Sequence, residues 1–232
     1  MTMWFHDRQD AGKYLADKLS PWIERDDVIV LALPRGGVPV AFEVAQSLHA
    51  PLDLMLVRKL GLPGQKELAM GALAPPDICV FNHEVIRNAA VSQEDIDAVV
   101  AKETEELKRL NRRYRFNEPP PDLKNKIVIL VDDGAATGAT MRAALNAVAQ
   151  QRPARVIAAL PVASPEAFEL LQQHANDVLC LHQPTLFLGV SEVYSHFDQT
   201  TDEEVMTLLE KARHWGKGHV HFDGGRKHAG GL

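Results

Sequence analysis

The chain has 232 residues, enough for one α/β domain with a sizeable core, and its 46% hydrophobic and 24% charged residues are an ordinary globular balance. A formal net charge of -6 gives no electrostatic case for binding nucleic acid or a membrane surface. The N-terminus lacks a signal peptide's basic start and apolar segment, and no apolar run approaches the roughly 20 residues of a membrane helix. We therefore expect a cytoplasmic protein, with Cys79 and Cys180 reduced and buried rather than joined in a disulfide.

Apolar, β-branched runs alternate with helical patterns along the chain. This alternation predicts an α/β fold, a doubly wound, mainly parallel sheet with helices on both faces. Capping residues such as Ser92, Ser164 and Thr201 mark helix starts. In chain order we expect helix 7–19, strand 27–33, helix 38–48, strand 53–57, an edge strand 78–81, a long helix from 92, strand 128–131, helix 141–150, strand 155–161, helix 164–173, strand 178–181 and helix 201–214.

We expect one domain over residues 1–213, with a small hood or insert at about 75–118 that contains the long helix. Residues 214–232 are rich in Gly, His and Lys and predict a flexible tail. The long helix carries an apolar stripe interrupted by Glu103. We favour packing of this stripe on its own domain over a homodimer seam, and a solvated helix end for the arginines at 112–115. The stripe comprises Ile96, Val100, Leu107, Leu110 and Tyr114.

The stretch from Val128 to Met141 is the main candidate for a binding site. Four apolar residues predict a buried strand, Asp132 and Asp133 follow at once, and then come only small residues as far as Thr140. A turn between the carboxyl end of a strand and the amino end of a helix offers free backbone N–H groups to a phosphate. Acids beside such a turn suit a ligand that carries both a phosphate and hydroxyl groups, such as a ribose 5-phosphate.

This stretch resembles the phosphoribosyl-pyrophosphate (PRPP) signature of the type I phosphoribosyltransferases: four apolar residues, two acids, a small-residue turn and Thr-Gly-x-Thr. Segments 31–40, 57–61, 67–72 and 194–205 are similar to a bacterial subgroup of predicted phosphoribosyltransferases. The resemblance spans roughly residues 5 to 212. It implies PRPP as ligand and Mg²⁺ as its companion, and it does not name the acceptor.

Two further segments complete the expected site. The turn at 34–37 follows the first strand, where the resembled family holds pyrophosphate. Arg58 and Lys59 follow the second strand, and Gly61 to Glu67 predicts a mobile loop that closes over the reacting sugar. The expected catalytic residues are Asp132, Asp133 and Arg58, and the two aspartates are expected to contact the metal indirectly, with PRPP. The expected PRPP-binding residues are Arg35, Gly36, Gly37, Arg58, Lys59, Asp132, Asp133, Ala135, Ala136, Thr137, Gly138, Ala139 and Thr140.

One departure from the family bears on the acceptor. Hypoxanthine–guanine enzymes carry an Asp where this chain has Ala136, so a 6-oxopurine acceptor is disfavoured and adenine is not. The acceptor-binding hood is expected among the N-terminal residues, 75–118 or 186–199.

The sequence thus predicts a Mg²⁺-dependent phosphoribosyltransferase that transfers the 5-phosphoribosyl group from PRPP to a small nitrogenous acceptor. The first alternative is a non-catalytic regulatory protein that binds PRPP or a nucleotide. A hydrolase or phosphotransferase acting on a ribose phosphate is the third hypothesis.

Overall fold

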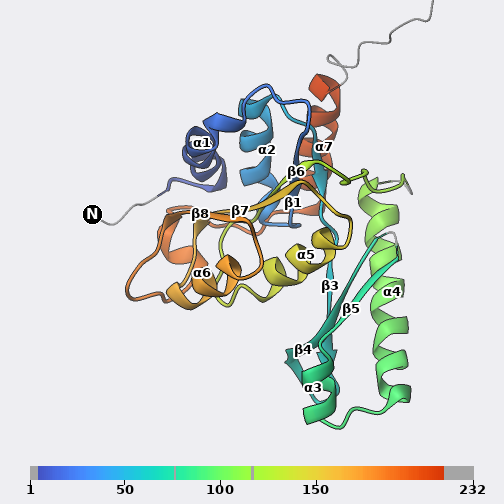
Figure 1. The fold of residues 1–232 in the computed structure, drawn as a ribbon. Coiled ribbons are helices and arrows are strands. Elements are labelled where there is room, and N and C mark those ends of the chain that lie inside the picture. The colour runs from blue at the N-terminus through green and yellow to red at the C-terminus, as the bar shows by residue number, and fades with distance from the viewer. Residues whose placement is uncertain (1–4, 76, 116–117, 217–232) are drawn as a thin grey trace, which may run out of the picture.

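The computed structural model describes residues 5–75, 77–115 and 118–216, which form two sheets of different kinds (Figure 1). The main sheet has five strands in the order β2-β1-β6-β7-β8, and every neighbouring pair in it is parallel. Strands β1 and β6 are buried along their whole length, as their unbroken apolar sequences predict. The strands are β1 Val28–Ala32, β2 Leu52–Leu54, β6 Ile127–Val131, β7 Arg155–Val162 and β8 Asp177–His182.

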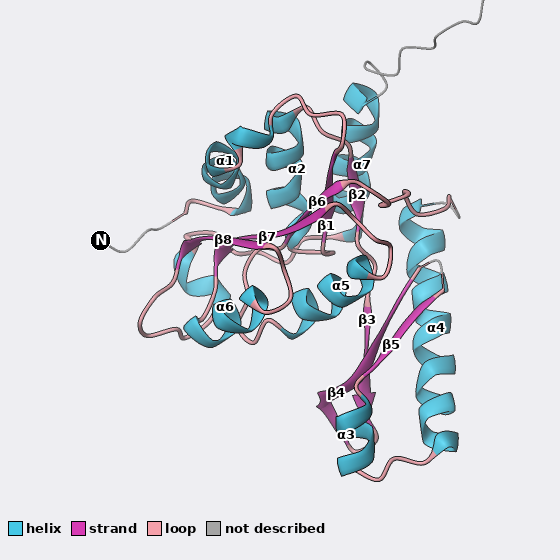
Figure 2. Cartoon of the chain, viewed as in Figure 1, coloured by secondary structure: helices cyan, strands magenta, loops and turns pink. Residues whose placement is uncertain are grey.

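Helices cover both faces of the main sheet (Figure 2). Successive side chains of a strand point to opposite faces, so Val28 and Val30 pack with α1, α2 and α7, whereas Ile29 and Leu31 pack with α5 and α6. The predicted doubly wound parallel sheet is therefore confirmed. The helices are α1 Arg8–Lys18, α2 Gly37–Leu48 and α7 Asp202–Gly216 on one face, and α5 Ala139–Ala149 and α6 Pro165–Gln172 on the other.

The second sheet is an antiparallel arm that lies beside the main sheet in Figure 1. The segment from Gly61 to Glu67, which was predicted to be a mobile loop, belongs to a β-hairpin whose turn is at Pro63 and Gly64. The arm begins at Arg58, so the predicted insert at 75–118 covers only part of it. Its elements are β3 Arg58–Leu62, β4 Gln65–Ala74, β5 Ile78–Phe81, α3 His83–Asn88 and α4 Gln93–Arg115.

Helix α4 packs on β3 and β4 of its own chain, as expected. The stripe residues Ile96, Leu107 and Tyr114 are buried in the core that includes Leu60 of β3. The stripe therefore packs against its own chain, and Val100 and Leu110 remain partly exposed.

The end of α4 differs from the predicted solvated end. Arg115 is only 4% exposed, its Nε lies 3.0 Å from Asp53 Oδ1, and it also donates to the backbone carbonyl of Leu54. Arg115 thereby ties the arm to β2. A buried guanidinium needs such partners, and the sequence pattern alone did not reveal them.

Local signals in the sequence agree with the structure at three helix starts. The hydroxyl oxygens of Ser92, Ser164 and Thr201 accept hydrogen bonds from the N–H groups three residues on, at 3.1, 2.9 and 3.1 Å.

Both cysteines are free thiols, but Cys79 is exposed, contrary to expectation, because β5 is an edge strand. In the part of the chain that the structure describes, no helix is both long and apolar enough to cross a membrane. The predicted tail lies mostly outside the described residues.

The contact of Arg115 with β2 leads to a stability prediction. Arg115→Met removes two charge-assisted hydrogen bonds and leaves the Asp53 carboxylate without its cation, so it should lower the free energy of unfolding by about 2–4 kcal/mol. The measurement is urea unfolding, with Arg112→Met as the control, because Arg112 is an exposed arginine on the same helix. Equal stabilities of the two variants would contradict a structural role for Arg115.

Candidate functional site

The candidate site lies where the main sheet reverses its strand order, between β1 and β6. From β1 the chain moves outward to β2 on one side, and β6 fills the position on the other side. Helix α2 follows β1 on one face and α5 follows β6 on the opposite face. The loops at 33–37 and 132–138 therefore border one crevice at the carboxyl ends of the strands, where ligands bind in folds of this kind.

These two loops approach each other too closely for side chains. The backbone N–H of Leu33 donates to the carbonyl of Val131 at 2.9 Å. A Cβ added to Gly36 would lie 2.1 Å from Oδ2 of Asp133, and one on Gly37 would lie 2.7 Å from the carbonyl oxygen of Val131. Glycine is therefore required at both positions by close packing, and the structure brings this turn and the acids together as the sequence suggested.

The small-residue loop after β6 is open to an anion. Its start is fixed, because the N–H of Ala135 donates to the carbonyl of Val162 at 2.9 Å, and its later turn requires Gly138, whose φ is +68°. Four amide N–H groups at the start of α5 donate no hydrogen bond to another described residue. They belong to Ala136, Thr137, Gly138 and Thr140. Such unpaired donors at a helix start attract a phosphate.

The two acids of the pair occupy different environments. Oδ1 of Asp132 accepts a hydrogen bond from the N–H of Asp133 at 2.9 Å. Burial raises the pKa of Asp132 well above its usual range, and the negative charge of Asp133 raises it further. Oδ2 of Asp133 accepts from Nε of Arg8 at 2.8 Å. Apart from the contact between the two carboxyl groups themselves, one oxygen of each accepts no hydrogen bond from a described residue, Oδ2 of Asp132 and Oδ1 of Asp133.

Two residues that contact the acid pair were missed from the sequence. Arg8 begins α1, and Tyr194 follows the short 3-10 helix Val190–Val193; its hydroxyl donates to the backbone carbonyl of Asp133 at 2.6 Å. Burial raises the pKa of the Tyr194 hydroxyl, which therefore remains a donor at neutral pH. The N-terminus and 186–199 were expected only as hood segments. No spacing in the sequence links positions 8 and 194 to position 133.

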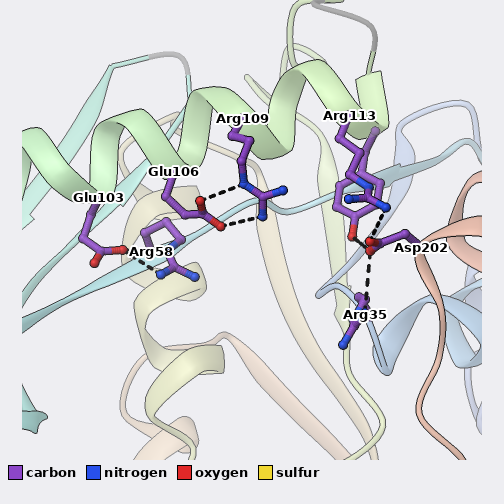
Figure 3. A network of polar contacts seen from close by, with 8 residues as sticks. Arg35, Arg58, Glu103, Glu106, Arg109, Arg113 and Asp202 are labelled. Carbon is purple, nitrogen blue, oxygen red and sulfur yellow. Dashed lines mark hydrogen bonds and ion pairs between the residues drawn. The ribbon is translucent and has the colours of Figure 1, made fainter.

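Two of the predicted pyrophosphate cations, Arg35 and Arg58, belong to a row of charged residues that follows α4 (Figure 3). Nη1 of Arg35 lies 3.7 Å from Oδ1 of Asp202, the first residue of α7. Arg58 and Lys59 were predicted at the carboxyl end of a parallel main-sheet strand, and this placement is wrong. Strand β2 ends at Leu54, and the two cations begin β3 of the arm. No described contact joins Arg58 to the acid pair, and its guanidinium pairs with Glu103 of α4 at 2.7 Å.

Asp202 joins Arg35 to helix α4 of the arm. Its carboxylate also lies 2.5 Å from Nη2 of Arg113 and accepts a hydrogen bond from the hydroxyl of Tyr114. Burial and the bond to Asp202 raise the pKa of Tyr114 to about 12, so this hydroxyl keeps its proton at neutral pH. Arg35 makes the longest contact of the three, and it is therefore the partner that Asp202 holds least tightly.

The N-terminal turn and the segment at 190–200 form a hood next to the acid pair. They are joined by backbone hydrogen bonds from Phe5 to Val193 at 2.8 Å and from Ser195 to Phe5 at 2.9 Å. A pocket of about 360 Å³ opens between this hood and the starts of α2 and α7. It is lined by His6, Asp7, Arg8, Gln9, Pro39, His196, Asp198, Gln199, Thr200 and Glu204.

The environment of Asp132 gives a prediction that needs no ligand. Its pKa is higher in the folded protein than in the unfolded chain, so ionisation weakens the folded state as the pH rises above about 4. Asp132→Asn should therefore raise the melting temperature at pH 7, and the gain should disappear toward about pH 3, where this carboxyl group is largely neutral in both the folded and the unfolded chain. Thermal unfolding across this pH range is the measurement. Asp97→Asn, at an exposed position of α4, should change little, and an unchanged or lower melting temperature of Asp132→Asn at pH 7 would contradict the raised pKa.

Comparison with known proteins places this geometry in a family. A model of the phosphoribosyl transferase domain matches residues 7–196. Two Mycobacterium tuberculosis proteins, from two strains and each named "Putative phosphoribosyl transferase", are 43% identical to the chain over 208 residues, which are 90% of this chain and 47% of each relative. The chain therefore spans about half the length of these curated relatives.

A solved structure is also similar to the chain. The crystal structure of the protein TT1426 from Thermus thermophilus is 42% identical to the chain and superposes with a TM-score of 0.83, covering 90% of this chain and 99% of that one. The chain belongs to the phosphoribosyl transferase domain family.

Proposed function

We propose that the protein is a Mg²⁺-dependent phosphoribosyltransferase that transfers the 5-phosphoribosyl group from PRPP to a small nitrogenous acceptor and releases pyrophosphate. The observation that carries the proposal is that hydrogen-bond donors and hydrogen-bond acceptors without partners lie together at one crevice. Unpaired amide donors lie at 136–140, and two carboxylate oxygens without donors lie on Asp132 and Asp133. A ribose phosphate supplies acceptor oxygens to the first group and hydroxyl donors to the second.

The residues of the crevice would divide the ligand among them. The open amides at 136–138 and 140, with the hydroxyls of Thr137 and Thr140, would hold the 5-phosphate at the start of α5. Ala135 was expected among these donors, but its N–H is already bonded to the carbonyl of Val162. Asp132 and Asp133 accept hydrogen bonds from the ribose hydroxyls. Arg35 and the Gly36-Gly37 backbone bind the pyrophosphate at the start of α2. Arg58 and Lys59 would neutralise this leaving group from the arm, which requires Arg58 to exchange Glu103 for the ligand.

The acid pair also fits a metal that arrives with the substrate. Among the residues that the structure describes, no three His, Cys, Asp or Glu side chains gather as a preformed metal cage. Mg²⁺ is commonly held by one or two carboxylates together with substrate phosphates and water, and Asp132 and Asp133 supply oxygens of this kind. When bound, the ion would neutralise charge on the pyrophosphate. No described residue needs to be displaced from the two open carboxylate oxygens to hold it.

The chain's own groups account for the proposed chemistry. Breaking the bond between the anomeric carbon and pyrophosphate develops positive charge on the ribose, and the nearby carboxylates stabilise that charge electrostatically. The pocket beneath the hood lies next to Arg8 and is the proposed place of the acceptor. A nitrogen that is already nucleophilic requires little general-base assistance.

A regulatory protein that binds PRPP or a nucleotide is the second candidate. The ion pairs of Arg35 with Asp202 and of Arg58 with Glu103 favour it to some extent, because both cations have partners in the chain already. A hydrolase or phosphotransferase acting on a ribose phosphate is the third candidate. A panel of nucleobases and other nitrogen acceptors with PRPP and Mg²⁺, monitored for pyrophosphate and for ribose phosphate, separates all three.

The first functional prediction is binding of PRPP. PRPP with Mg²⁺ at a hundred times its dissociation constant should raise the melting temperature by about 5–10 °C, because it binds only the folded state. The double variant Asp132→Asn, Asp133→Asn should lose most of this shift. A matched double variant at exposed positions, Asp17→Asn with Asp97→Asn, should keep it. Calorimetry that detects no PRPP binding to the wild-type protein would falsify the proposed function.

The second functional prediction separates an enzyme from a regulator. If Arg58 acts on the leaving pyrophosphate, its contact is stronger in the transition state than in the ground state. Arg58→Ala should then reduce turnover by about 30- to 1000-fold, and the affinity for PRPP should fall much less. Turnover is measured with the acceptor that the panel reveals, and affinity by calorimetry. The control is Lys108→Ala, which removes an exposed ion pair with Glu105 on the same helix as Glu103. Equal losses in turnover and affinity would indicate uniform binding and favour the regulator.

A further inference from the structure

Arg8 is a nearly buried cation that contacts two separate parts of the crevice, the acid pair and the hood. Its side chain is 12% exposed and its Nε donates to Oδ2 of Asp133 at 2.8 Å. Nη1 donates to the backbone carbonyl of Asp198 at 2.6 Å, and the guanidinium lies 3.8 Å from the ring centroid of Phe197. One side chain thus links the start of α1, the acid pair and the hood.

The hood holds Asp133 at a second point. The hydroxyl of Tyr194 donates to the backbone carbonyl of Asp133, and the Tyr194 ring packs between Phe5 at 5.6 Å and Phe197 at 4.9 Å, measured between ring centroids. Arg8 fixes the carboxylate and Tyr194 fixes the main chain of the same residue. Both contacts depend on the hood segment at 193–198 being in place.

The geometry of the ion pair leaves Asp133 available to a ligand. Arg8 uses only Oδ2, and Oδ1 accepts no hydrogen bond from a described residue. A carboxylate can accept on both oxygens, so Oδ1 remains an acceptor of fixed direction. Stability alone does not explain the arrangement, because a well-packed apolar pair is often as stable as a buried ion pair.

We propose that Arg8 is a positioning residue that orients the Asp133 carboxylate toward a ribose hydroxyl of PRPP and couples this orientation to the placement of the hood. The inference rests on the proposed function. It assigns the ribose end of the ligand to the Arg8–Asp133 pair, whereas the pyrophosphate end belongs to the turn at 35–37. The two ends can therefore be tested separately.

The test measures the affinity of folded variants for two ligands by calorimetry, PRPP with Mg²⁺ and inorganic pyrophosphate without added metal, because the acid pair is itself proposed to contact Mg²⁺. Arg8→Met keeps the apolar stem against Phe197 but removes both hydrogen bonds. It should bind PRPP about 10- to 100-fold more weakly and pyrophosphate as well as the wild-type protein does. Arg8→Lys keeps the charge and should recover part of the loss. Tyr194→Phe, which removes only the bond to the Asp133 backbone, should reduce PRPP affinity by a smaller factor.

The control is Arg25→Met, which removes an exposed ion pair with Asp27 and should leave both affinities unchanged. Unaltered PRPP affinity in Arg8→Met would overturn the inference, and so would equal losses for PRPP and pyrophosphate, which indicate general damage to the site. If Arg8→Met does not fold, Arg8→Lys decides, because a single ammonium does not reproduce the two separate donors that the planar guanidinium directs at Asp133 and Asp198; unaltered PRPP affinity there also overturns the inference. A wild-type protein that binds pyrophosphate but not PRPP would instead refute the proposed function, and the inference with it.

Discussion

The site depends on the close approach of the β1 and β6 loops. Strand pairing places Ala32 opposite Val131, so β1 and β6 leave the sheet at the same level. Slipping this register by one residue would turn the side chains to the other face and separate the glycine turn from the acids. The absence of side chains at Gly36 and Gly37 then lets the backbone of one loop lie against the carboxylates of the other. The glycine turn proposed to bind pyrophosphate and the acids proposed to bind ribose hydroxyls can meet only because this contact is made.

Two outlying parts of the chain hold that contact from opposite ends. The hood reaches the acid pair through Arg8 and Tyr194, and the arm reaches the glycine turn through Asp202 and Arg35. Each of these arginines is already paired with a carboxylate of the chain, as is Arg58 with Glu103. The proposed binding of pyrophosphate by Arg35 and Arg58 would therefore exchange the ion partners of these two arginines. Such an exchange would moderate the gain in affinity, because each new contact of these cations replaces an old one, and it would favour ligands whose charges match both cations.

The central strands, the acid pair and the small-residue loop could be predicted from the sequence, whereas the contacts that the hood and the arm make with them could not. Apolar runs with strict boundaries predicted β1, β6 and β7, and the acid pair and small-residue loop follow directly from chain order. The hairpin at β3–β4 was taken for a loop because Gly61, Pro63 and Gly64 lie close together, although only Pro63 and Gly64 form the turn. Arg58 was misplaced for a different reason: the second strand was predicted to run to Val57, whereas β2 ends at Leu54 and Arg58 begins β3. Arg8, Tyr194 and Asp202 act across separations of 125, 61 and 167 residues from their partners Asp133 and Arg35, and no periodicity in one sequence records such contacts.

The environment of Asp132 shows what the site costs the fold. A carboxylate that is buried next to another carboxylate destabilises the folded state at neutral pH. This cost is largest in the absence of a ligand. Ribose hydroxyls or a metal ion beside the acids would relieve it, and a phosphate would find the open amides at the start of α5. Arg8, Tyr194 and Asp202 around these groups are hydrogen-bonded or ion-paired and keep them in place.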